Sequence, residues 1–304
     1  MARPVEFFSR GIKIAGDLYL PAPSAPDRKG AAIVIGHPSG GVKEQTSALH
    51  AQRLAENGFI ALAFDAAYQG ASEGEPRGLE DPFQRSEDVR SAVTFLSTLE
   101  EVDKSRIGAL GICASGGYVP FAAQTDLRIK AVATVSAVDA GAIAREGLKN
   151  TPFELDRATL AKGLEAAGAN RIAEAKGEEV QCNPIVPDLP EGPAADEPLN
   201  EATEYYRTKR GFHPRSTNRC PVRSTDLLAN FSAYHFNNLI SPRPLLMIAG
   251  GEAHTLYFSK EGIDRAEEPK ELFVVPGRSH MALYDHLDEH MPKLVDFMTN
   301  ALCN

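Results

Sequence analysis

The chain has 304 residues, of which 43% are hydrophobic and 24% charged, and its formal net charge is −9 at pH 7. This composition is ordinary for a globular protein, and the length suffices for one large core with an insertion or for two domains. The negative charge argues against a surface for nucleic acid or an anionic membrane, and no stretch approaches the ~18 apolar residues of a membrane span. We therefore expect neither nucleic acid nor membrane among its partners.

The cysteines are too scattered for a disulfide framework, and the N-terminal segment has no long apolar stretch typical of a secretory signal. Both features predict a reducing, cytoplasmic location. No motif indicates a cofactor or a metal ion. His286 and His290 have the spacing of metal ligands, but their acidic neighbours favour a solvated helix start. A homodimer is compatible with the sequence. The four cysteines are Cys113, Cys182, Cys220 and Cys303.

The first half of the chain alternates short apolar runs with helical segments. Continuous apolar runs are typical of strands covered on both faces, and apolar positions at helical spacing indicate amphipathic helices. This alternation predicts a parallel α/β sheet, in which sites lie at the carboxyl ends of the strands. The expected strands cover residues 5–8, 12–20, 31–36, 59–64, 107–112 and 129–136, and the expected helices cover residues 44–56 and 84–99.

The alternation stops after the strand at 129–136 and returns with an apolar run at 244–249. We therefore expect an α/β core formed by residues 1–139 and 240–304, with residues 140–239 forming a helical cap over the carboxyl ends of the strands. The helices expected in this insertion cover residues 152–167, 171–177 and 201–207. The elements expected after it are a helix at 259–267, a strand at 271–275 and a closing helix at about 291–302.

The segment RIGALGICASGGY has the form of a sharp strand-to-helix turn that presents a nucleophile. Such a turn needs small residues two positions before the nucleophile and two and three positions after it. Gly111, Ser115 and Gly116 meet this need around Cys113, and the helix start would favour a thiolate there. Ser115 is the alternative nucleophile, but Tyr118 would then occupy a position that requires a small residue.

A thiol nucleophile needs a base, and His280 lies in the loop after the last expected strand. Histidine exchanges protons near neutral pH, and its ring is commonly oriented by a carboxylate. Glu252, after the strand at 244–249, is the favoured acid. Asp139, which follows the preceding strand, is the alternative.

An acyl intermediate also needs two N–H donors for its oxyanion. Ala114, directly after the nucleophile, would provide one. The loop after the strand at 31–36 would provide the other from Ser39, because Pro38 has no N–H. The residues expected to contact substrate, from loops at the carboxyl ends of the strands, are His37, Tyr68 and Gln69.

Taken together, HPSGG, GICASGG, an acid after a strand and GRSH resemble the α/β-hydrolase fold, in the order nucleophile, acid, histidine. A cysteine at the turn resembles dienelactone hydrolase and its relatives, which include hydrolase-like polyketide transferases of fungi. The resemblance covers most of the chain outside the insertion, although relatives often carry aspartate where this chain has His254. It implies an enzyme that cleaves a small-molecule ester, lactone or thioester through a cysteine acyl-enzyme. Acyl transfer, a serine esterase using Ser115 and a non-catalytic binding protein are the alternatives.

The insertion also carries a basic cluster that could receive a carboxylate or phosphate of a substrate. Pairing with the acidic run before it is the simpler interpretation. The cluster comprises Arg207, Lys209, Arg210, Arg215, Arg219 and Arg223, and the acidic run comprises Glu191, Asp196, Glu197, Glu201 and Glu204.

Overall fold

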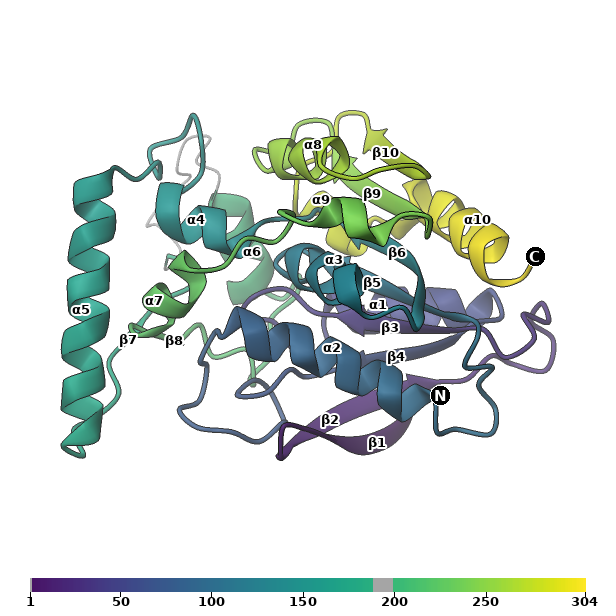
Figure 1. The fold of residues 1–304 in the computed structure, drawn as a ribbon, viewed down its shortest axis with the longest axis horizontal. Coiled ribbons are helices and arrows are strands. Elements are labelled where there is room, and N and C mark those ends of the chain that lie inside the picture. Colours follow the sequence, from purple (N-terminus) through teal and green to yellow (C-terminus); the bar gives the residue numbers. More distant parts are fainter. Residues whose placement is uncertain (1, 188–198) are drawn as a thin grey trace.

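The computed structural model describes residues 2–187 and 199–304. Its centre is an eight-stranded sheet with the order β1-β2-β4-β3-β5-β6-β9-β10 (Figure 1). β1 and β2 form an antiparallel hairpin at one edge, β2 is antiparallel to β4, and the other neighbours are parallel. The predicted α/β class is thus confirmed. The strands are β1 (Ala2–Ser9), β2 (Ile12–Tyr19), β3 (Ala32–Gly36), β4 (Ile60–Phe64), β5 (Ile107–Ile112), β6 (Ile129–Val135), β9 (Leu245–Gly250) and β10 (Lys270–Val275).

Helices cover both faces of this sheet. Side chains of α2, α3 and α8 pack on one face, and side chains of α1 and α10 pack on the other. Every residue of β3, β4 and β5 is buried, which explains why these strands read as continuous apolar runs. The helices of the core are α1 (Thr46–Glu56), α2 (Pro82–Leu96), α3 (Ser115–Thr125), α8 (Leu256–Asp264), α9 (Ala282–Asp285), η2 (Leu287–Glu289) and α10 (Met291–Leu302).

The segment between β6 and β9, residues 140–239, is called the cap below. Apart from the two-residue pair β7–β8, its regular elements in the described residues are helices, which Figure 1 shows gathered at one end of the molecule. Residues 188–198 of the expected cap lie outside the described residues. The cap elements are α4 (Ala140–Glu146), α5 (Arg157–Ala175), β7 (Cys182–Asn183), α6 (Asn200–Arg207), β8 (Cys220–Pro221), α7 (Ser224–Ala229) and η1 (Asn237–Ile240).

One prediction within the cap is wrong. The two helices expected at 152–167 and 171–177 form the single helix α5. A β-carbon at Gly168 would meet nothing within 4 Å, so this glycine faces open space and weakens the helix without ending it. Packing on α7 and the ion pair of Arg171 with Asp226, at 2.6 Å, hold the helix across the expected break.

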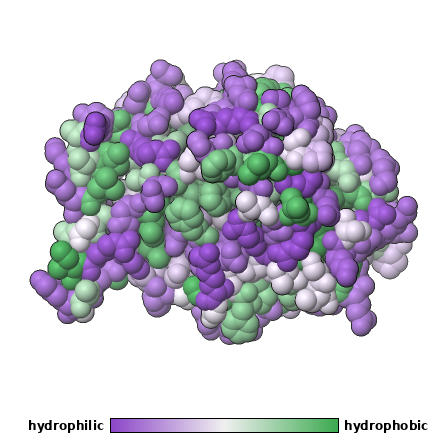
Figure 2. All heavy atoms as spheres, in the orientation of Figure 1, coloured by the Kyte–Doolittle hydropathy of each residue, from purple (hydrophilic) through white to green (hydrophobic). Residues whose placement is uncertain are grey.

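The outer surface carries no single large apolar patch on the face drawn in Figure 2. Hydrophilic residues predominate there, and hydrophobic ones form small separate patches. Among the described residues, no helix combines the length and the apolar character needed to cross a membrane.

Candidate active site

Cys113 lies on a sharp turn between β5 and α3, here called the elbow. Its φ is +56°, a left-handed conformation that costs a non-glycine residue about 1–3 kcal/mol. A β-carbon at Gly111 would lie 2.0 Å from the carbonyl oxygen of Ser115, and one at Gly116 would lie 2.5 Å from Cβ of Ala137. These two positions therefore accept only glycine, which is the steric requirement that the sequence indicated.

Cys113 is half-buried, and its sulfur faces the hydroxyl of Tyr284 and the N–H groups of Ala114 and Ser39. Within residues 2–187 and 199–304, neither N–H makes a backbone hydrogen bond. Burial raises the pKa of the Cys113 thiol above its ordinary value, while the contacts with these three groups lower it without offsetting the effect of burial. The prediction that the helix start favours a thiolate at Cys113 is therefore wrong, because the effect of burial on the pKa is larger than the effect of the helix start.

A cavity of about 310 Å³ opens above Cys113. Ser39, Cys113 and His280 of the core contribute to its wall, and the cap supplies most of the rest. Among the described residues that line it there is no lysine or arginine, whereas three glutamates are present. The larger aliphatic side chains from the cap are Ile143, Leu148, Ile185, Val186, Leu199 and Leu228.

His280 follows β10 and is held at both ring nitrogens. Its Nδ1 lies 2.6 Å from Oγ1 of Thr255, and its Nε2 lies 3.1 Å from the hydroxyl oxygen of Tyr284. The Ser136 hydroxyl donates to the backbone carbonyl of His280 at 2.9 Å and fixes the loop. Burial lowers the pKa of His280 to about 4, so the ring is neutral near pH 7 and can accept a proton.

Neither expected acid contacts the His280 ring. Glu252 is exposed at the edge of the cavity, and among the described residues its carboxylate makes no hydrogen bond to the ring. The Asp139 carboxylate accepts two N–H bonds from the first turn of α4 and one, at 3.0 Å, from Ala233. Asp139 thus caps a helix and anchors a cap loop. The hydroxyl of Thr255 occupies the position expected for the acid.

Ser115 does not face the cavity. Its hydroxyl donates to the backbone carbonyl of His37 at 2.6 Å and accepts from Arg85 at 3.2 Å. The residue is 2% exposed and is absent from the cavity lining in the described part of the chain. The hydroxyl points beneath the elbow, and the alternative with Ser115 as nucleophile has no geometric support.

The three residues expected to contact substrate also lie elsewhere, and none lines the cavity in the described ranges. His37 is 1% exposed, and its Nε2 accepts the N–H of Ala66 at 3.0 Å. The Gln69 amide donates to a backbone carbonyl of its own loop. Tyr68 lies in the same loop after β4, which folds around the buried carboxylate of Asp65 instead of reaching the cavity. The expectation was wrong because this loop satisfies its own polar groups.

Thr255 and Tyr284, which contact the two ring nitrogens of His280, were not predicted from the sequence. Tyr284 follows His280 by four residues, the spacing of one helical turn, and this spacing is the signal that could have indicated it. Thr255 stands directly after His254, so the register of the loop after β9 decides which side chain meets the ring.

Three members of the basic cluster of the cap are paired with carboxylates. Arg210 contacts Asp285 at 2.7 Å and two glutamates of α6 at 3.3 Å each. Arg215 and Arg223 pair with glutamates as well. These contacts favour the structural interpretation of the cluster. Of the acidic run, Glu191, Asp196 and Glu197 lie outside the described residues.

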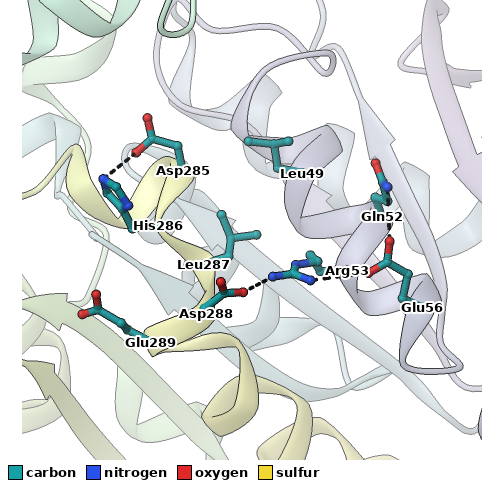
Figure 3. Close-up of a pocket in the computed structure, with 9 residues that line it drawn as sticks. All are labelled: Leu49, Gln52, Arg53, Glu56, Asp285, His286, Leu287, Asp288 and Glu289. Carbon is teal, nitrogen blue, oxygen red and sulfur yellow. Dashed lines mark hydrogen bonds and ion pairs between the residues drawn. The ribbon is translucent and has the colours of Figure 1, made fainter.

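A second hollow, of about 420 Å³, lies between α1 and the α9–η2 segment (Figure 3). Its arginine, Arg53, pairs with Glu56 and Asp288. His286 is exposed there, whereas His290 is buried with its Nε2 3.2 Å from Nε2 of His50. His286 and His290, which have the spacing of metal ligands, therefore do not face the same site. Among the described residues, no cysteine or serine lines the hollow, so it offers neither of these nucleophiles.

Comparisons with known proteins agree with this geometry. Residues 17–137 match the model of the Dienelactone hydrolase family. The crystal structure of PA2218 from Pseudomonas aeruginosa has a TM-score of 0.92 and 39% sequence identity, covering 99% of this chain and 94% of that chain. The uncharacterized protein YcjY of Escherichia coli is 40% identical over 295 residues, covering 96% of this chain and 95% of the relative. Thiohydrolase aneE of Aspergillus aculeatus is 26% identical over 291 residues, covering 94% and 86% respectively.

The sheet order and the elbow followed by a buried helix define an enzyme with the α/β-hydrolase fold. Within that class, the chain belongs to the dienelactone hydrolase family. Its activity is that of a hydrolase or acyltransferase of the α/β-hydrolase type.

Proposed function

We propose that the protein cleaves a neutral ester, lactone or thioester with an apolar acyl group through an acyl-enzyme on Cys113. His280 removes the thiol proton, and the sulfur attacks the carbonyl carbon. The N–H groups of Ser39 and Ala114 stabilise the oxyanion, and His280 returns its proton to the leaving group. Water activated by His280 then releases the acid.

The observation that carries this proposal is the convergence of two N–H groups on one sulfur at the wall of a cavity. The N–H groups of Ser39 and Ala114 both act on the Cys113 sulfur. An oxyanion on a carbonyl bonded to this sulfur would lie within reach of the same donors. Fixed donors at the position of the developing oxyanion are the strongest support for acyl chemistry.

We propose that Thr255 orients His280 in place of a carboxylate. Its Oγ1, 2.6 Å from Nδ1, suits the tautomer that carries the proton on Nδ1 and leaves Nε2 free to accept. A neutral hydroxyl fixes the ring but stabilises an imidazolium less than a carboxylate does. In this proposal Glu252 belongs to the rim of the cavity and not to the proton path.

The wall of the cavity supports a neutral, apolar acyl group. Most of its surface is apolar, and its carboxyl residues in the described part of the chain are Glu80, Glu201 and Glu252. The Glu80 carboxylate accepts a hydrogen bond from Tyr118 and lies 3.6 Å from the Arg85 guanidinium, so it is already paired. A substrate carboxylate in the cavity would meet acids and no cation among the described residues, which disfavours it.

The test compares two aryl esters of similar size, 4-nitrophenyl butyrate and 4-nitrophenyl hemisuccinate, which differ by one carboxylate. An uncompensated charge in the cavity costs more than the ~1.4 kcal/mol that corresponds to a tenfold change. We therefore expect kcat/KM for the butyrate to be higher by about tenfold or more.

Cys113→Ala should abolish turnover of both esters, whereas Ser115→Ala should retain most of it. Product analysis with an added alcohol shows whether water or a second acceptor takes the acyl group. Full turnover by Cys113→Ala would contradict the proposal.

A further inference from the structure

Tyr284 lies between the two groups that the proposed mechanism couples. Its hydroxyl oxygen is 3.1 Å from Nε2 of His280, and the same hydroxyl interacts with the sulfur of Cys113. No hydrogen bond joins the His280 ring directly to Cys113 within residues 2–187 and 199–304. The Tyr284 hydroxyl is therefore a contact that the thiol and the imidazole share.

Several contacts fix the position of this hydroxyl. Tyr284 belongs to α9, is 0% exposed, and packs edge-on against Tyr205 with ring centroids 5.1 Å apart. Its backbone carbonyl accepts the hydroxyl of Thr46 at 2.9 Å. Arg210 holds α9 from the cap through Asp285, with Nε 2.7 Å from the carboxylate. The phenol thus has a fixed place behind the cavity wall, out of contact with bulk water.

The hydrogen bonds of this chain have a direction that suits proton transfer. With its proton on Nδ1, His280 donates to Thr255 and accepts the O–H of Tyr284 at Nε2. The Tyr284 oxygen keeps lone pairs that can accept the thiol proton. Burial raises the pKa of Tyr284 well above its ordinary value, so the phenol stays protonated between turnovers.

We infer that Tyr284 relays the proton from Cys113 to His280 during acylation, a role that rests on the proposed function. The S–H bond breaks and its proton passes to the Tyr284 oxygen, while the O–H proton of Tyr284 passes to Nε2 of His280. The sulfur electron pair forms the S–C bond, and the carbonyl π pair moves onto the oxygen. The phenol ends unchanged, the thiol has lost one proton, and the imidazole has gained one.

The experiment replaces Tyr284 by phenylalanine, which keeps the ring and removes the hydroxyl. Tyr205→Phe is the matched control, because Tyr205 packs against Tyr284 but is not among the residues that line the cavity in the described ranges. Acylation by 4-nitrophenyl butyrate is followed by the burst of nitrophenol in mixtures of H₂O and D₂O. Thermal melts of both variants show whether each is folded.

General acid–base catalysis contributes about 10²–10⁴-fold, so Tyr284→Phe should acylate at least about a hundredfold more slowly than the wild type. Tyr205→Phe should stay within about threefold of the wild type, since changes away from the reacting groups have small effects. The acylation rate of the wild type should follow a curve when plotted against the deuterium fraction of the solvent, because two protons move in the same step. In Tyr284→Phe the residual rate should depend on it linearly, a difference that a purely structural role would not produce.

Two further variants separate the relay from the proposed function. If Cys113→Ala and His280→Ala are inactive while Tyr284→Phe acylates as fast as Tyr205→Phe, the relay is wrong and the acyl-enzyme stands. If Cys113→Ala itself keeps the burst, the acyl-enzyme fails and the relay fails with it. A linear deuterium dependence in the wild type would also overturn the relay.

Discussion

Replacing Thr255 by valine tests how the histidine is oriented. Valine matches threonine in size, but it removes the hydroxyl that lies 2.6 Å from Nδ1 of His280. The Nδ1–H would be left without this partner in a largely buried site, which costs about 1–3 kcal/mol. At ~1.4 kcal/mol for each factor of ten, kcat/KM should fall by about 5- to 150-fold.

The control is Glu252→Gln, which alters the acid that the sequence favoured. Because this carboxylate is exposed and makes no hydrogen bond to the ring among the described residues, the change should stay within about 0.5 kcal/mol, or roughly twofold. Both variants are assayed on 4-nitrophenyl butyrate, with thermal melts to verify folding. If Glu252→Gln lost far more activity than Thr255→Val, a carboxylate would orient the ring during turnover and the reasoning would fail.

Three other predictions follow from the charges and burial. The rate of alkylation of Cys113 by iodoacetamide should still increase with pH above about pH 9, because burial raises the pKa of this thiol above the ordinary 9.0. A rate that stops increasing below about pH 8 would show that Cys113 is already a thiolate there and would contradict this prediction. The free energy of unfolding should fall as the pH drops from 6.5 towards 4, because His50 and His290 bind protons in the unfolded chain but stay neutral when buried in the folded protein. The pKa of His50, lowered to about 4, contributes about 3 kcal/mol over this range, and urea melts of His50→Gln should show a flatter pH dependence. Arg210→Ala should lower the melting temperature and reduce kcat/KM for the butyrate and hemisuccinate esters equally, whereas a selective loss on the hemisuccinate would assign Arg210 to substrate.

Most of the core could be predicted because its strands and helices have recognisable local sequence patterns. The strands β3, β4 and β5 are apolar throughout, since both of their faces are covered, and such runs are visible without any tertiary information. The cap was harder to divide. The continuous helix α5 depends on packing against α7 and on the ion pair between Arg171 and Asp226. These two residues are 55 positions apart in the sequence, so the contact is not visible as a local pattern.

The site shows the same division between local and distant information. The elbow is a local steric pattern, and Gly111 and Gly116 are required by backbone distances that follow from the turn itself. The partners of His280 are set by how the loops after β9 and β10 meet, which one sequence does not specify. A shift of three residues along the first loop separates Glu252 from Thr255, and only the folded chain shows that the hydroxyl reaches the ring.

The most direct test of the central claim is to locate the acyl group. The protein is mixed with 4-nitrophenyl butyrate, quenched in acid within the burst and digested with trypsin, and the peptide of residues 107–128 is fragmented in a mass spectrometer. This peptide contains both Cys113 and Ser115, so its fragment ions distinguish them. A butyryl group is expected on Cys113 in the wild type and none in Cys113→Ala. A butyryl group on Ser115, or turnover with no acylated peptide at all, would contradict it.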